Sequence, residues 1–238
     1  MKSTKKALCV AVALLLALSC FMLAGCGAKN EVKGIGTAKT TQPQQTAAPT
    51  TAPAATDDSA ETLPVNGYKK PYTGTSKTVE IDVKDYGKIT VELDSKTAPL
   101  TVQNFLNLVN EGFYDGLTFH RIIKGFMVQG GDPQGTGMGG STNQIKGEFA
   151  SNGVINNIKH VRGVISMARS SAPNSASSQF FIMHQDAPHL DGEYAAFGKV
   201  TSGMEVVDKL AETAKVEDAN GTVAKANQPV IKSIKILE

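Results

Sequence analysis

The sequence has no tryptophan and only three cysteines among its 238 residues. Three cysteines are too few for the disulfide framework of a small secreted domain. There is also no excess of charge of one sign, because 24 basic and 22 acidic side chains leave a formal net charge of +2. This near-neutral balance argues against a protein that binds nucleic acid through electrostatics.

A membrane-spanning run is also missing from the N-terminus, where the apolar stretch from Ala7 to Leu18 is shorter than the roughly 20 residues that a spanning helix needs. Lysines precede this stretch, as in a secretory signal peptide. The next motif, Leu-Ala-Gly-Cys at residues 23–26, resembles the lipobox of bacterial lipoproteins. The resemblance implies cleavage after residue 25, a diacylglyceryl group on Cys26, and a lipid-anchored protein on the extracytoplasmic face of the cell membrane. The alternative is an ordinary signal peptide in which Cys26 is incidental.

Cleavage at this point would change the composition of the protein. Residues 1–25 contain three lysines and no acidic residue, so the remaining chain would have 21 basic and 22 acidic side chains. Cys9 and Cys20 would leave with the signal peptide, and Cys26 would be consumed by the lipid. Without a free thiol, the mature protein could use neither a thiol nucleophile nor a cysteine-ligated metal.

Residues 26–75 are expected to form a disordered tether. Between residues 37 and 56 there are seven Thr, six Ala, three Pro, three Gln and one Lys. A segment without large apolar side chains cannot bury enough surface to offset the entropy of ordering. We interpret it as a spacer that holds a domain away from a membrane; inert filler is the alternative interpretation.

Residues 76–238 are expected to form one globular domain. Apolar residues alternate with polar residues at 79–83 and 89–93, which predicts a β-hairpin. The helical spacing of apolar residues predicts one helix after Pro99 and a second one around residues 207–214. Short apolar runs at 119–123, 126–129, 163–167, 179–183, 194–200 and 230–237 predict further strands. Many short strands with two helices favour a mainly β fold, a closed antiparallel barrel of about eight strands capped by two α-helices.

Several familiar catalytic and binding motifs fail in context. Residues 135–140 match G-x-G-x-x-G, but Asp132-Pro133 precedes them where a strand should run in and no helical periodicity follows, so we predict a tight surface loop. His184, His189 and Asp191 lie close together in sequence, but their spacing fits no standard zinc motif. The serines at 170–178 lack a G-x-S-x-G elbow. We therefore expect no metal and no cofactor.

The segment at 119–132, FHRIIKGFMVQGGD, places one arginine among apolar residues. Strand alternation would put positions 119, 121 and 123 on one face and positions 127 and 129 on one face of the next strand. From the pattern alone, Arg121 is either an exposed edge charge or a cation aimed into an apolar pocket.

This segment resembles the signature of the cyclophilin family of peptidyl-prolyl cis–trans isomerases. The resemblance continues in order through GVISMA (163–168), SQFFI (178–182), LDG (190–192) and FGKV (197–200). It covers roughly residues 78–238. The resemblance implies a cyclophilin-like fold, no cofactor, and an enzyme that accelerates rotation about X-Pro bonds to assist the folding of secreted or envelope proteins.

The resemblance also assigns roles to residues. Arg121 would be the catalytic donor to the prolyl nitrogen, and Gln129 would position Arg121 and the substrate. The proline ring would enter an apolar slot, and the substrate backbone would rest against Ala168 and Arg169. The residues assigned to the slot are Phe126, Met127, Phe181 and Leu190.

Three positions of the predicted substrate site depart from the best-known eukaryotic members. Arg169 replaces asparagine and would add a cation that favours acidic or extended substrates. His189 replaces tryptophan, which should weaken cyclosporin binding, and Tyr194 replaces histidine but can still close the pocket. The expected partners are proline-containing flexible polypeptides and, through Cys26, a membrane; the domain is expected to be monomeric. The alternative function is a module that binds proline-containing chains with little turnover.

Overall fold

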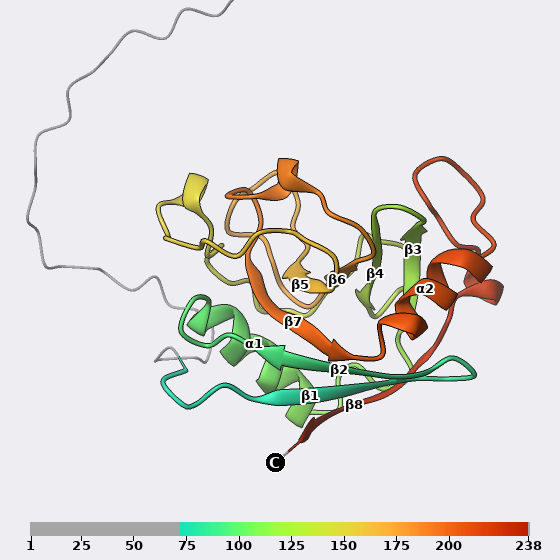
Figure 1. Cartoon of the computed structure of the whole chain (residues 1–238), viewed down its shortest axis with the longest axis horizontal. Helices are drawn as coiled ribbons and strands as arrows, with labels where there is room; N and C mark the ends of the chain where they lie inside the picture. Colours follow the sequence, from blue (N-terminus) through green and yellow to red (C-terminus); the bar gives the residue numbers. More distant parts are fainter. Residues whose placement is uncertain (1–71, 238) are drawn as a thin grey trace, which may run out of the picture. The chain divides into compact units, whose positions relative to one another are not determined.

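The computed structural model describes residues 72–237 (Figure 1), so the predicted signal peptide, Cys26 and nearly all of the predicted tether lie outside the described residues. The two α-helices are α1 (Pro99–Asn110) and α2 (Met204–Thr213). The eight strands are β1 (Thr78–Val83), β2 (Gly87–Leu93), β3 (Thr118–Ile123), β4 (Met127–Asp132), β5 (Val164–Met167), β6 (Phe180–Met183), β7 (Ala196–Ser202) and β8 (Ile231–Leu237). No helix within residues 72–237 is long and apolar enough to cross a membrane.

The mainly β prediction, with about eight strands and two helices, is confirmed. In the β1–β2 hairpin the alternation works as expected, since every second residue of β1 is buried, and Val91 on β2 lies opposite Val79. Asp85 and Gly87 have positive φ angles in the turn, a conformation that suits a tight two-strand connection.

Helix α1 begins at Pro99, which has no N–H to leave unpaired in the first turn. Its first turn has no cap from its own N-cap residue, but the buried carboxylate of Glu148 accepts the backbone N–H groups of Leu100 (3.0 Å) and Thr101 (2.8 Å) and the Thr101 hydroxyl. A carboxylate at this end also suits the helix dipole. Burial nevertheless raises the pKa of Glu148. A residue 48 positions away therefore fixes the start of α1.

The prediction of a closed barrel is wrong, because the eight strands form one open, half-barrel sheet in the order β3-β4-β6-β5-β7-β2-β1-β8. Within the described residues, the edge strand β3 meets the β8 end only through an isolated bridge from Thr118 to Val230. Farther along β3, the loop before β8 occupies the edge: Ile122 donates to the Gly221 carbonyl (2.8 Å), and Val223 donates to the His120 carbonyl (3.0 Å). These bonds cover the part of the edge where a closing strand would pair.

A β-bulge in β3 contradicts the simple alternation expected for residues 119–123. Phe119 pairs with Gly130 and Arg121 pairs with Gln129, so His120 has no partner of its own in the ladder. The extra residue turns Phe119 and Ile122 toward the main core, whereas Arg121 lines a cavity. Bulges commonly redirect side chains in this way next to functional sites.

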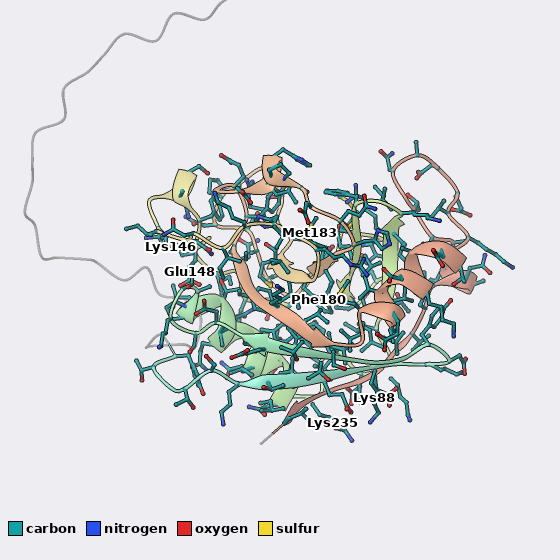
Figure 2. All side chains as sticks on the ribbon, in the orientation of Figure 1. Lys88, Lys146, Glu148, Phe180, Met183 and Lys235 are labelled. Atoms are coloured by element: carbon teal, nitrogen blue, oxygen red, sulfur yellow. The ribbon has the colours of Figure 1, made fainter. Side chains whose placement is uncertain are left out.

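The main core is built around aromatic rings. The ring of Phe105 on α1 lies 5.1–5.6 Å, centroid to centroid, from those of Tyr114, Phe180 and Phe197. Phe180 and Met183 are both buried at the centre of the domain, as Figure 2 shows. Met183 belongs to a smaller second cluster with Met127, Phe181 and other side chains. The second cluster forms the floor of the candidate site.

Candidate active site

The structure brings nine of the ten predicted catalytic and substrate-binding residues to one cavity of about 240 Å³. The cavity is lined by Arg121, Phe126, Met127, Gln129, Ala168, Arg169, Phe181, Leu190 and Tyr194. The tenth, His189, is not part of the lining, but its ring stacks on Phe126 with centroids 5.7 Å apart. Strands β3, β4 and β6 contribute Arg121, Met127, Gln129 and Phe181, and the β3–β4 turn contributes Phe126. The other four lining residues come from the segments at 168–169 and 190–194.

Arg121 is held by contacts on both sides of its guanidinium group. Nε donates to the Asn220 carbonyl (2.8 Å), and Nη1 lies 3.3 Å from Oε1 of Gln129, its neighbour on β4. No hydrogen bond from Nη2 forms within residues 72–237. Burial lowers the pKa of Arg121, yet an arginine stays protonated at neutral pH. The cavity therefore contains a half-buried cation that is fixed in place and can still donate hydrogen bonds from Nη2.

A chain of amide groups continues from Gln129. Its Nε2 donates to Oε1 of Gln179 (2.8 Å), and Nε2 of Gln179 donates to the carbonyls of Gly137 (3.0 Å) and Gly139 (2.7 Å). The G-x-G-x-x-G match is thus a surface loop, as predicted. Its carbonyl groups hold the side chain of Gln179, which in turn accepts a hydrogen bond from Gln129. Each amide both donates and accepts, so the orientation of Gln129 toward Arg121 is fixed.

The carboxylate of Asp132 at the end of β4 organises this glycine-rich loop. It accepts the backbone N–H groups of Gln134, Thr136, Gly137 and Gly139. Burial alone would raise the pKa of Asp132, but these four donors together lower it. The loop is therefore wrapped around a buried anion.

The slot for an apolar ring is built mainly from buried residues. Met127, Phe181 and Leu190 are each less than 10% exposed. The Phe181 ring packs edge-on against Tyr194 (5.8 Å) and stacks over His160 (6.1 Å). This geometry leaves an apolar wall with one polar tip, the phenol of Tyr194.

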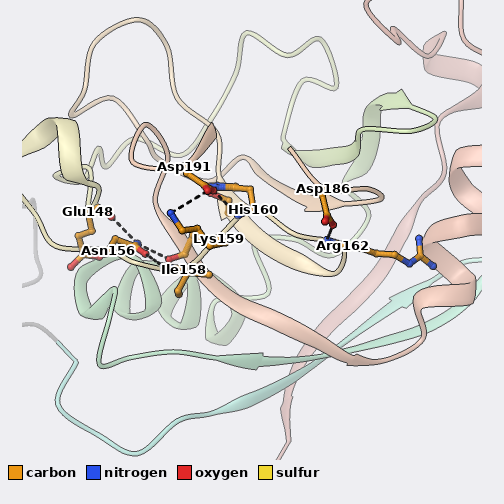
Figure 3. Close-up of polar contacts among 10 residues, drawn as sticks. Glu148, Asn156, Ile158, Lys159, His160, Arg162, Asp186 and Asp191 are labelled. Carbon is orange, nitrogen blue, oxygen red and sulfur yellow. Dashed lines mark hydrogen bonds and ion pairs between the residues drawn. The ribbon is translucent and has the colours of Figure 1, made fainter. Parts of the chain in front are cut away.

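Behind Phe181, His160 is tied to Asp191, the residue after Leu190 (Figure 3). The Asp191 carboxylate accepts the His160 backbone N–H (2.8 Å) and lies 3.1 Å from its Nδ1, while Nε2 lies 3.1 Å from the Ser166 hydroxyl. Burial lowers the pKa of His160, although Asp191 acts in the opposite direction. The arrangement resembles a Ser-His-Asp triad, but Ser166 is fully buried, so it supports the slot and offers no accessible nucleophile.

The side chain of Arg169 does not present a free cation to the cavity. Its Nε and Nη2 both donate to the Glu193 carbonyl (3.0 and 2.9 Å), and its guanidinium lies over the rings of Phe149 (5.0 Å) and Tyr194 (4.7 Å). Only 13% of the side chain is exposed. Arg169 therefore forms part of the cavity wall. Its charged group interacts with the Glu193 carbonyl and the rings of Phe149 and Tyr194.

The histidines that raised the question of a metal site have other partners. His184 lies 3.4 Å from Asp208 through Nε2, and His160 rather than His184 or His189 lies beside Asp191. Across residues 72–237, no group of three or more His, Cys, Asp or Glu residues is arranged to hold a metal ion.

Two supporting groups had no role in the sequence-based assignment. Gln179 lies within the SQFFI motif, but its partners are 40 to 50 residues away in sequence. Asn220 supports Arg121 through its backbone carbonyl, which no side-chain pattern reveals. Asp218 holds the Asn220 loop in shape by accepting the Thr222 N–H (3.0 Å) and hydroxyl (3.0 Å).

A second cavity, of about 460 Å³, adjoins the first and shares Gln129, Ala168 and Arg169 with it. Its other lining residues are Gly137, Met138, Gly139, Gly140, Ser141, Gln144, Ser170, Ser175, Ser177 and Gln179. Aromatic and aliphatic side chains predominate in the lining of the first cavity, and glycines and polar side chains predominate in that of the second.

Comparison with known proteins identifies the domain. A family model described as cyclophilin type peptidyl-prolyl cis-trans isomerase/CLD matches residues 78–238. The peptidyl-prolyl cis-trans isomerase of Helicobacter pylori is 46% identical over 152 residues, which are 63% of this chain and 90% of that protein. Peptidyl-prolyl cis-trans isomerase B of Bacillus subtilis is 49% identical over 129 residues, or 54% of this chain and 87% of that protein.

Solved structures agree with the relatives. A cyclophilin type peptidyl-prolyl cis-trans isomerase of Cryptosporidium parvum covers 69% of this chain and 99% of its own, with 34% identity and a TM-score of 0.61. The same protein in the presence of the dipeptide Ala-Pro matches with 36% identity and a TM-score of 0.60, over 68% of this chain and 99% of that one. The chain therefore belongs to the family of cyclophilin-type peptidyl-prolyl cis-trans isomerases.

Proposed function

We propose that this chain catalyses cis–trans isomerisation of X-Pro bonds in flexible polypeptides, as a lipid-anchored enzyme that assists the folding of secreted or envelope proteins. The observation that carries the proposal is the half-buried, fixed guanidinium of Arg121 at the edge of an apolar slot in a 240 Å³ cavity. The structure of a family member with the dipeptide Ala-Pro supports the choice of substrate.

The reaction explains why these side chains suffice. Rotation about a peptide bond crosses a barrier of about 18–20 kcal/mol, because twisting removes the resonance between nitrogen and carbonyl. The enzyme must bind the twisted amide better than either planar form. In the twisted state the prolyl nitrogen gains a lone pair, and a guanidinium N–H aimed at it then becomes a favourable donor. No bond is made or broken in this step.

The described residues divide this task. The proline ring would enter the slot between Phe126, Met127, Phe181 and Leu190, and the substrate backbone would lie along Ala168 and Arg169. Gln129 keeps Arg121 oriented, so little of its binding energy is lost to ordering the side chain. Residues before the proline would extend toward the neighbouring 460 Å³ cavity.

A protease-coupled assay on an Ala-Pro-Phe peptide tests the activity. The wild-type chain should accelerate cis-to-trans conversion, and Arg121→Ala should lower kcat/KM by about 10²- to 10³-fold, the usual loss when one transition-state donor is removed. Arg121→Lys keeps the charge but loses the planar fork, and should recover only part of the rate. If Arg121→Ala isomerises the peptide as fast as wild type, the mechanism is wrong.

The proposed location depends on sequence alone, since Cys26 lies outside the described residues. The lipobox-like motif at residues 23–26 supports a diacylglyceryl anchor, and two acyl chains give a stable one. Some 49 residues would then separate the anchor from the domain, a coil spanning on the order of 40 Å. Cys26→Ser should move the protein out of the membrane fraction or leave the precursor uncleaved; unchanged fractionation and processing would refute the anchor.

A role in folding is a separate part of the proposal. Refolding limited by prolyl isomerisation takes tens to hundreds of seconds, long enough for a secreted chain to aggregate. Deleting the gene should therefore lower the amounts of particular proline-containing secreted proteins, and an Arg121→Ala copy should fail to restore them. Restoration by that copy would show that binding, and not isomerisation, serves these proteins.

A further inference from the structure

The turn between β3 and β4 carries Phe126 into the proline slot. Lys124 and Gly125 complete the turn, and Gly125 has a positive φ of 83°. The Phe126 carbonyl accepts the backbone N–H groups of His184 (2.9 Å) and Gln185 (3.3 Å), while its own N–H donates to the Ile123 carbonyl (3.0 Å). The backbone on the Phe126 side of the turn is thus paired with protein groups.

The Gly125 N–H is paired differently, because it donates to a side chain, Nδ1 of His184, at 3.0 Å. A backbone N–H can only donate, so Nδ1 must be the unprotonated acceptor of a neutral imidazole. The ring proton is then on Nε2, which lies 3.4 Å from Oδ1 of Asp208 on α2. His184 is buried, and its ring bridges the turn and the helix.

The charged groups around His184 hold this bridge in place. The Arg162 guanidinium binds both carboxylate oxygens of Asp208 (2.7 and 2.8 Å) and also donates to the His184 carbonyl (2.8 Å). Asp186 accepts the Arg162 backbone N–H at 2.8 Å, a contact drawn in Figure 3. The Arg162 fork lowers the pKa of Asp208, so this carboxylate is ionised at neutral pH. The mechanism described above uses none of these four residues.

We infer that His184 is a positioning residue for the isomerase site: by accepting the Gly125 N–H it fixes the turn that places Phe126 in the proline slot, and Asp208 holds it in the tautomer that can do so. This inference rests on the proposed isomerase activity for its kinetic consequence. Its structural part, the acceptor role of Nδ1, stands on geometry alone.

Protonation would reverse this role. A proton on Nδ1 would place two donors face to face, Nδ1–H and the Gly125 N–H, and the turn would lose its only side-chain acceptor at this N–H.

Two substitutions separate the contact of His184 with Gly125 from its contact with Asp208. The side-chain oxygen of His184→Asn can take the place of Nδ1 and accept the Gly125 N–H without titrating. His184→Gln reaches toward Asp208 but leaves the Gly125 N–H without an acceptor. At pH 7.5, KM of the full chain for an Ala-Pro-Phe peptide should rise about three- to tenfold in His184→Gln, with kcat little changed, and should stay near wild type in His184→Asn.

Rescue by the Asn variant is a readout that a merely structural role would not show, because His184→Asn removes the imidazole ring as completely as His184→Gln does. Equal losses in the Asn and Gln variants, or a fall in kcat of the Gln variant with KM unchanged, would overturn the inference.

A ¹⁵N–¹⁵N coupling across the hydrogen bond between the Gly125 amide and Nδ1 of His184 tests the bridge in wild type without any variant or activity. The coupling should be observed at pH 7.5, the pH of the kinetic comparison. Absence of the coupling would refute the bridge, even if the peptide is isomerised. Absence of isomerase activity together with an observed coupling would instead refute the proposed function and keep the bridge.

Discussion

Arg169 offers a sharp test of how the wall of the site is built. The sequence suggests a cation available to acidic substrates, whereas in the structure its guanidinium lies between Phe149 and Tyr194 and donates twice to the Glu193 carbonyl. The perturbation is Arg169→Asn, which introduces the residue of the best-known family members and removes every one of these contacts.

The expected magnitude follows from those contacts. Hydrogen bonds from a charged donor contribute about 1.5–3 kcal/mol each, and a cation–π contact contributes about 0.5–2 kcal/mol. Because such terms are not additive and 13% of the side chain is exposed, we expect a loss of about 2–4 kcal/mol in the free energy of unfolding. A domain of this size should then melt several degrees lower, at about 2–4 °C per kcal/mol.

The assay combines thermal melting with peptide kinetics. Loosening of Tyr194 should raise KM several-fold for every peptide, whether the residue before proline is Ala, Glu or Lys. Arg169→Lys is the matched control, because it keeps the charge but cannot form the two parallel bonds to Glu193, and it should resemble the Asn variant. A melting temperature within about 1 °C of wild type, or a rise in KM confined to the Glu-Pro peptide, would show that the Arg169 charge is not used within the protein in this way.

Three further predictions concern support, capping and pH. Gln179→Ala should lower kcat/KM about tenfold with little change in stability, since it removes the partner that orients Gln129, and an unchanged rate in the protease-coupled assay would contradict this. Glu148→Ala should cost about 2–4 kcal/mol in urea unfolding, because it strands buried donors at the start of α1; Glu148→Gln, which keeps an acceptor, should cost less, and equal losses would count against capping. Burial lowers the pKa of His120, whose ring nitrogens have no partner within the described residues. As the pH falls, the unfolded chain therefore takes up a proton on His120 before the folded chain does. The free energy of unfolding present above about pH 6.5 should decline below that pH, by up to about 1.4 kcal/mol per pH unit. Urea unfolding of His120→Gln should show a smaller decline with pH.

The strands and helices could be predicted because local patterns determine them. Alternation at 79–83 and 89–93 and helical spacing after Pro99 depend on which face is buried, and the structure confirms the elements. That the sheet stays open could not be predicted in this way. It depends on the loop around Gly221 lying along β3, a contact between segments about 100 residues apart.

The site shows the same division between local and long-range information. Family resemblance was sufficient to select Arg121, Gln129 and the slot residues, which the structure places around one cavity. It did not show that a bulge at His120 aims Arg121 away from the core, since a bulge changes the register without changing the composition of the strand. Nor did it show that Arg169 is engaged by Phe149 and Glu193, because those partners meet only in the folded chain.

In the proposed mechanism, Arg121 stabilises a twisted prolyl amide and does more than bind proline. Exchange spectroscopy on an Ala-Pro peptide with substoichiometric full chain measures binding and turnover in the same sample. We expect the cis and trans signals of the peptide to exchange far faster than the uncatalysed tens to hundreds of seconds. With Arg121→Ala, binding should persist while exchange returns almost to the uncatalysed rate. Binding by the wild-type chain without accelerated exchange would contradict the account and would indicate a proline-binding module.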